Sequence, residues 1–290
     1  MRRILAYFAA AAALCAALCR PVLASEPSEL YYNLIGRADT AISVADWKEA
    51  ELCLIEAIAA EPQSPVNTLL LSNLGLVQYN LGRDSVALAT LTRAHDTWPR
   101  SVTILQNRAQ VLAAMGRDSA AMADYEAVCR LDTTLIEPRF MHAMLAIGRG
   151  DTLTAEADCR RLLEMDARDM SVMQACASLR AFQKRWAEAL PYYDGLIDES
   201  PTADLYAARA ICLLELNRLN EASSDITSGL RLDPGNADLY FARAHLNKRR
   251  YLPDDARADL KRALGVSPPE PAPEAAKPRI DPKSDPIYDK

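Results

Sequence analysis

The chain has 290 residues, of which 50% are hydrophobic and only 6% are aromatic, and it carries a net charge of −6. A composition with few glycines and aromatic residues favours helices over sheets. A surface that binds nucleic acid needs concentrated Lys and Arg, and the sequence contains no basic stripe. We therefore expect a helical protein that has no nucleic-acid partner.

The first 24 residues have the pattern of an export signal. Arg2 and Arg3 precede an apolar run over residues 4–18, and a small-residue cleavage pattern ends at Ala24. The sequence therefore predicts a signal peptide over residues 1–24, cleavage before Ser25 and a protein that is periplasmic or secreted. After cleavage we expect no integral membrane span.

Two alternatives place the same segment in a membrane. A transmembrane anchor would need a longer apolar run, and Arg20 and Pro21 interrupt this one. Lipid attachment at Cys15 or Cys19 would anchor the chain instead, but a leucine precedes each cysteine where such signals have a small residue. Both features favour cleavage over an anchor.

Small residues recur along the chain with a period close to 34 residues. Two such series run in parallel and stay twelve residues apart. Because helices approach closely only where both carry small side chains, this spacing predicts repeated helical hairpins. The first series is Ala38, Gly75, Ala109, Ala143, Ala177, Ala210 and Ala244, and the second is Ala50, Ala87, Ala121, Ala155, Ala189, Ala222 and Ala256.

Turn residues support the same hairpins. Gly82, Gly116 and Gly150 each come a few residues before a member of the second series, where the chain must turn between two helices. Prolines follow most repeats, at positions where a helix cannot continue. These prolines are Pro62, Pro99, Pro201, Pro234 and Pro268.

In a 34-residue frame, the small residues occupy positions 8 and 20, the prolines occupy position 32, and apolar residues occupy position 24. This pattern resembles the tetratricopeptide repeat. The resemblance implies an all-α fold, a right-handed α-α superhelical solenoid of about seven helix-turn-helix repeats over residues 25–267. The repeats span about 31–67, 68–101, 102–135, 136–169, 170–202, 203–236 and 237–267, and the residues at position 24 are Leu54, Leu91, Tyr125, Cys159, Tyr193, Ile226 and Leu260.

Oppositely charged residues recur sixteen positions apart within the repeats, at positions 7 and 23. A catalytic centre is not copied several times in tandem, so we interpret these pairs as structural contacts between the two helices of one hairpin. The pairs are Arg108 with Asp124, His142 with Asp158, Arg209 with Asp225 and Arg243 with Asp259.

No residue pattern in the sequence indicates a catalytic, metal or cofactor site. His95, His142 and His245 lie on different repeats, and no phosphate-binding or nucleophile motif is present. The five cysteines after the signal are expected to be buried free thiols. Cys159 and Cys176 are close enough in the repeat frame to form a disulfide, so that alternative stays open for this pair. The sequence therefore predicts a protein that is not an enzyme and that has no cofactor.

The resemblance also implies a binding surface. In the family, the first helix of each repeat lines a concave groove, and carrying its positions over gives an uncharged mixture of apolar and amide side chains. Such a mixture suits protein or peptide segments. The predicted protein-binding groove consists of Leu69, Asn73, Leu76, Tyr79, Gln106, Asn107, Gln110, Phe140, Met144, Gln174 and Phe182.

The expected function is thus that of a non-catalytic interaction scaffold of the cell envelope or secreted space. A chaperone-like or regulatory subunit of an envelope enzyme or assembly complex is the alternative, and the partner and oligomeric state stay open. The family's clamp for a C-terminal carboxylate needs Lys or Arg from the first and third repeats of a triplet, and no consecutive triplet supplies them. The sequence therefore argues against a cytosolic receptor for chaperone tails. Beyond the repeats, residues 268–290 contain seven prolines and are predicted to be a disordered tail.

Overall fold

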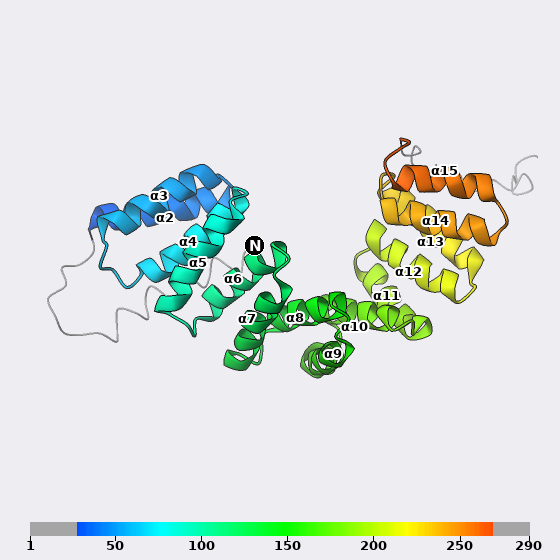
Figure 1. The fold of residues 1–290 in the computed structure, drawn as a ribbon, viewed down its shortest axis with the longest axis horizontal. Coiled ribbons are helices and arrows are strands. Elements are labelled where there is room, and N and C mark those ends of the chain that lie inside the picture. The colour runs from blue at the N-terminus through cyan, green and yellow to red at the C-terminus, as the bar shows by residue number, and fades with distance from the viewer. Residues whose placement is uncertain (1–27, 269–290) are drawn as a thin grey trace, which may run out of the picture. The chain divides into compact units, whose positions relative to one another are not determined.

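The computed structural model describes residues 28–268, which form α-helices and no strands (Figure 1). This confirms the predicted all-α fold. The predicted signal peptide and nearly all of the predicted tail lie outside the described residues. The helices are α2 (Glu29–Ser43), α3 (Trp47–Ala60), α4 (Asn67–Asn80), α5 (Asp84–Thr97), α6 (Val102–Ala114), α7 (Asp118–Leu131), α8 (Ile136–Gly148), α9 (Thr152–Asp166), α10 (Met170–Phe182), α11 (Trp186–Glu199), α12 (Ala203–Glu215), α13 (Leu219–Leu232), α14 (Ala237–Arg249) and α15 (Pro253–Ala263).

Two compact units share these helices, and the division falls between Pro99 and Arg100. The first unit contains α2 to α5, and the second contains α6 to α15. Within each unit, consecutive helices pack in pairs, α2 with α3 in the first and α6 with α7 in the second, for example. Each pair consists of an A helix followed by a B helix, as the repeat pattern predicts.

The two series of small residues lie where the helices of a pair cross. Ala109 on α6 and Ala121 on α7 are both fully buried, as are Ala177 and Ala189 in a later pair. Gly75 on α4 is the extreme case, because a Cβ atom there would lie 2.5 Å from Cγ of Leu91 on α5. Close packing therefore explains why these positions carry only Ala or Gly.

The turn from each A helix to its B helix passes through the left-handed backbone region. Gly82, Gly116 and Gly150 adopt positive φ there at no steric cost. The remaining four turns reach the same conformation without glycine; asparagine tolerates it, whereas the other three side chains disfavour it. Those residues are Ala45, Lys184, Asn217 and Tyr251, each with φ close to 60°.

Side chains at repeat junctions form the N-caps of several A helices. The carboxylate of Asp169 accepts hydrogen bonds from the backbone amides of Ser171 and Val172 at the start of α10. Ser101 and Asn236 cap α6 and α14 in the same way. These caps satisfy amides that have no partner inside the helix, and so they fix where each A helix starts.

Apolar side chains join one repeat to the next. In the second unit, Ile226 and Leu230 of α13 belong to one buried cluster with Leu239 and Leu246 of α14. Gly229 lies in the same contact, since a Cβ atom there would lie 2.6 Å from Cδ1 of Leu239. The B helix of one repeat is therefore covered by the A helix of the next.

Candidate functional site

The sixteen-residue pairs are ion pairs inside the hairpins. Nε and Nη2 of Arg108 each donate to a different oxygen of Asp124 at 2.7 Å. Arg209 makes the same two-pronged contact with Asp225 at 2.8 and 2.7 Å, and Nη2 of Arg243 lies 2.6 Å from Asp259. The prediction that these groups pair across their own hairpins is confirmed.

The fourth pair differs because a second cation joins it. Nδ1 of His142 lies 2.6 Å from Oδ2 of Asp158, and Nη1 of Arg139 donates to Oδ1 of the same carboxylate at 3.1 Å. Both His142 and Asp158 are buried. The carboxylate is thus fully engaged with groups from its own hairpin, which is a structural arrangement and not that of a free general base.

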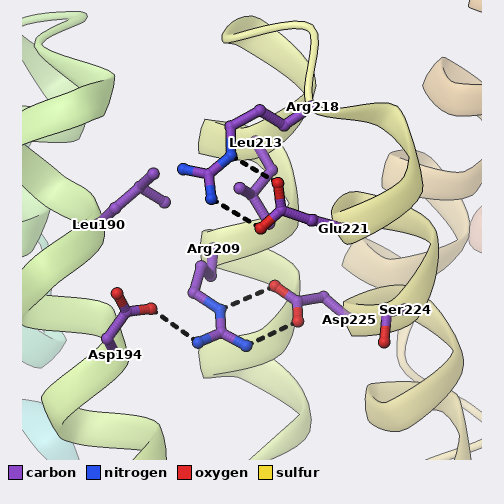
Figure 2. A pocket seen from close by; sticks show the side chains of 8 residues that line it. All are labelled: Leu190, Asp194, Arg209, Leu213, Arg218, Glu221, Ser224 and Asp225. Carbon is purple, nitrogen blue, oxygen red and sulfur yellow. Dashed lines mark hydrogen bonds and ion pairs between the residues drawn. The ribbon is translucent and has the colours of Figure 1, made fainter.

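Figure 2 shows a cleft of about 270 Å³ beside one of these pairs, between α11, α12 and α13. Arg209 bridges the three helices, because its Nη1 donates to Asp194 at 2.7 Å while Asp225 holds its other side. Higher in the view, Arg218 pairs with Glu221 at 2.6 Å. The sequence pattern identified Asp225 but not Asp194, which lies on the preceding repeat.

The chemistry of this cleft follows from that pairing. Both guanidinium groups face carboxylates, and the adjacent carboxylate raises the pKa of Arg209 above its usual range. Arg209 is partly buried and donates to carboxylates on two sides, so it offers little to an anionic ligand. The ion pairs of Arg209 therefore join adjacent repeats, and none of the residues that line the cleft is an activated nucleophile or general base.

The predicted groove residues of the first unit all lie on α4. Leu69, Asn73, Leu76 and Tyr79 are each partly exposed. Other α4 side chains, such as Leu70 and Leu74, face the buried cluster of this unit. One face of α4 is thus available at the surface while the opposite face holds the core together.

In the second unit, the predicted groove residues divide into accessible and packed side chains. Phe182 on α10 is 48% exposed, and Gln110 and Gln174 are exposed as well. Phe140 and Met144 on α8 are half-buried and pack against the cluster that contains Ala143 and Leu179. Gln106 and Asn107 on α6 are also partly exposed.

Helices α8 and α10 pack directly on each other, so their groove residues share one surface. We call this surface the α8–α10 face and define it by Phe140, Met144, Gln174 and Phe182. None of the four is fully buried. They combine apolar area with an amide that can both donate and accept hydrogen bonds.

A second group of A-helix residues was missed by the sequence reasoning. On α12 and α14, which also pack on each other, Glu215 lies 3.3 Å from Nη2 of Arg249 and 3.9 Å from Nδ1 of His245. Ile211 and Phe241 are exposed on the same two helices. Their motif positions match those of the predicted groove, so extending the frame to the last two repeats would have found them.

Cys159 on α9 and Cys176 on α10 are buried and lie in contact as free thiols. A hydrogen bond with Cys176, together with burial, raises the pKa of Cys159, while the same hydrogen bond lowers the pKa of Cys176. The Tyr192 hydroxyl contacts Cys176 from α11. The three groups form a small polar cluster inside the apolar core.

Within residues 28–268, no cluster of His, Cys, Asp and Glu side chains is arranged to hold a metal ion. None of the helices described is both long and apolar enough to cross a membrane.

Comparison with known proteins agrees with this architecture. Residues 102–134 and 140–204 match family profiles described as tetratricopeptide repeats. The crystal structure of a tetratricopeptide repeat protein from Parabacteroides merdae is 26% identical, with a TM-score of 0.71, and the match covers 83% of this chain and 94% of that one. The chain therefore contains tetratricopeptide repeats and has their all-helical solenoid fold.

Two curated relatives carry names of known function. A tetratricopeptide repeat and J domain-containing co-chaperone of Cryptococcus neoformans is 22% identical over 75% of this chain. DnaJ homolog subfamily C member 7 of Mus musculus is 26% identical over 52% of it. The chain spans 44% and 33% of the lengths of these relatives, so the likeness concerns only part of each.

Proposed function

We propose that this protein is a non-catalytic scaffold that binds segments of other proteins on the exposed faces of its A helices. One observation carries the proposal: the eleven predicted groove residues all remain at least partly accessible, although their helices also build the core. A contiguous group of apolar side chains that stays exposed on a folded protein is typical of an interaction surface.

The chemistry of the α8–α10 face favours a peptide. Phe182 can be desolvated by an apolar side chain of a partner, and Gln174 can bond to a peptide backbone as donor and acceptor. Phe140 and Met144 also pack against the core, so they shape the surface more than they anchor a ligand. We therefore expect Phe182 to contribute most of the binding energy on this face.

A chaperone-like or regulatory subunit is the second candidate function. It is supported by the two relatives, whose names describe a co-chaperone and a DnaJ homolog. A scaffold of this kind would hold unfolded or transient clients and not a permanent partner. The two functions differ in the lifetime of the complex and use the same surface.

Export to the periplasm or secretion is part of the same proposal. It is supported by the pattern of residues 1–24, with two arginines, an apolar run and a small-residue cleavage site. N-terminal sequencing of the protein from its host should find Ser25 at the start. An acylated Cys19 at the first position would place the protein on a membrane instead.

The binding proposal is tested by affinity capture from the host with a Phe182→Ala, Gln174→Ala double variant. We expect recovery of bound proteins, identified by mass spectrometry, to fall at least fivefold, while circular dichroism remains that of the parent chain. Leu153→Ala is the matched control, because Leu153 is exposed in the same unit but on a B helix. Unchanged recovery with the double variant would remove the α8–α10 face as the binding site.

A further inference from the structure

Position 24 of the repeat has a different environment in the last repeat. In the first six repeats its residue is at most 5% exposed, whereas Leu260 on α15 is 41% exposed. Position 28 behaves in the same way, because Leu264 is 68% exposed while its six counterparts are buried or half-buried. The buried residues at position 24 are Leu54, Leu91, Tyr125, Cys159, Tyr193 and Ile226.

The internal junctions show which kind of element covers these positions. Leu54 of α3 shares a buried cluster with Leu70 and Val77 of α4. Ile226 of α13 shares one with Leu239 and Leu246 of α14. In both cases the cover is a helix that presents two apolar residues seven positions apart.

No helix of the described chain follows α15. The sequence from Pro268 to Lys290 has no more than four consecutive residues between prolines. It therefore has no stretch of the length that α4 and α14 use to cover the preceding repeat. Leu260 and Leu264 form the end face of α15, and an array that ended in solvent would need a polar face there.

The first repeat, by contrast, has such a polar face. On α2, Asn33, Arg37 and Thr40 occupy positions 3, 7 and 10, and all three are exposed. In the next repeat, apolar residues hold positions 3 and 10. The exposed face of α2 is thus unsuited to cover Leu260 and Leu264 of another copy, which argues against head-to-tail stacking.

Charge on the end face of α15 distinguishes two possible occupants, an identical face of a second copy and a helix of another protein. Arg257 and Lys261 are exposed beside the two leucines. Arg257 pairs with Asp254 of its own helix at 3.1 Å, but both side chains are exposed, so this pair is weak and leaves the guanidinium open to a partner. A two-fold contact between identical faces would bring these cations together, at a cost in free energy. An acidic helix would meet them with complementary charge.

We propose that the end face of α15 docks an acidic amphipathic helix of a partner protein. The helix takes the place that an A helix takes at the internal junctions, with two apolar residues seven apart over Leu260 and Leu264. Its carboxylates lie against Arg257 and Lys261. This surface belongs to B helix α15 and is separate from the α8–α10 face, so each can fail without the other.

The test uses a synthetic helical peptide of about 18 residues, long enough for five turns, with two leucines seven positions apart and glutamates on both flanks. Binding to the full chain is read by fluorescence anisotropy, and a second peptide carries lysines in place of the glutamates. We expect the glutamate peptide to bind at least tenfold more tightly than the lysine peptide. The variant Leu260→Asp with Leu264→Asp should weaken its binding at least tenfold, and Leu153→Asp should leave it unchanged.

A charge reversal separates docking from simple hydrophobic contact. In the variant Arg257→Glu with Lys261→Glu, the preference should reverse so that the lysine peptide binds more tightly. Both substitutions are at exposed positions, and unchanged circular dichroism checks that the fold is retained. Equal binding of the two peptides by the parent chain would overturn the proposal.

Three other results would assign the face to a different occupant and also overturn it. A dimer in analytical ultracentrifugation that Leu264→Asp dissociates would mean a second copy of the chain. A tenfold gain in peptide affinity on removing residues 269–290 would mean that these residues occupy the face. Co-sedimentation with phosphatidylglycerol vesicles that depends on Leu264 would mean a membrane surface.

Discussion

The second and third repeats, one from each unit, join their paired helices with different chemistry at the same positions. In the second repeat, positions 7 and 23 hold Leu74 and Thr90, and Thr90 donates to Gln78 at 2.8 Å. In the third repeat they hold Arg108 and Asp124, which form a two-pronged ion pair. Both hairpins cross at small residues that are buried.

The crossing of small residues thus defines the hairpin, while the neighbouring contact varies from repeat to repeat. A neutral hydrogen bond and an ion pair occupy equivalent places in the same backbone arrangement. They differ in what happens when one partner is removed, because an unpaired charge is much more costly to bury than an unpaired hydroxyl. The two hairpins should therefore lose different amounts of stability when one partner is removed.

The largest effect is expected from removing one member of an ion pair. Asp124→Ala leaves the guanidinium of Arg108 without its partner in a mostly buried place and should lower the free energy of unfolding by about 3 kcal/mol. The matched change in the neutral hairpin, Thr90→Ala, should cost about 1 kcal/mol. Urea denaturation followed by circular dichroism measures both.

A double substitution tests the same comparison from the other side. Arg108→Leu with Asp124→Leu should change the free energy of unfolding by less than about 1 kcal/mol, because apolar packing often replaces a buried pair without loss. A loss as large as that of Asp124→Ala alone would mean that the ion pair, and not the unpaired charge, determines stability.

The crossing itself is tested in the first unit. Gly75→Ala places a Cβ atom 2.5 Å from Cγ of Leu91, so we expect a loss of about 2 kcal/mol in urea denaturation. Combining it with Leu91→Ala should cost less than the two single changes added together, since the smaller side chain gives the new methyl room. Strict additivity of the two would contradict the crowded crossing.

The pH dependence of the second unit should show a buried tyrosine. Burial raises the pKa of Tyr193 to about 12, so its neutral form is favoured in the folded state. The stability that the buried, neutral Tyr193 contributes is fully present below about pH 10, the pKa of tyrosine in the unfolded chain. It is lost as the pH rises through about 12. Between about pH 9 and about pH 11.5, the parent chain should therefore lose about 1–2 kcal/mol of stability that the Tyr193→Phe variant retains. Urea denaturation at the two pH values measures this difference.

The smallest effect concerns the turns, where both units contain strained residues. Lys184→Gly in the second unit and Ala45→Gly in the first should each raise the free energy of unfolding by up to about 1 kcal/mol, because glycine adopts positive φ without steric cost. Gly116→Ala should lower it by a similar amount. Thermal denaturation of the three variants measures these changes and would show whether glycine stabilises both turns or only one of them.

Sequence reasoning predicted the helical fold and the ion pairs because both depend on residues close in the chain. A period of 34 residues and a separation of sixteen around one turn fix which residues of a hairpin meet. Arg209 with Asp225 was found in this way. Asp194 was not, since its contact with Arg209 depends on how one repeat packs on the next.

The repeat pattern predicted part of the exposed surface of the A helices. Repeat positions indicated which A-helix residues point away from their own B helix, and this placed Phe182 at the surface. They could not separate Phe182 from Phe140, because the half-burial of Phe140 depends on its packing against the following repeat. The exposed Ile211 and Phe241 lay in repeats that the prediction did not include.

The sequence by itself determined the hairpin: its small crossing residues, its capped helix starts and its internal ion pairs are local and repeat at a fixed spacing. Only the tertiary structure decided which apolar positions are covered. Ile226 and Leu260 hold the same position of the repeat pattern, yet Ile226 is buried and Leu260 is exposed. The physical reason is that burial depends on the neighbouring repeat, and the last repeat of the described chain has no helix beyond it.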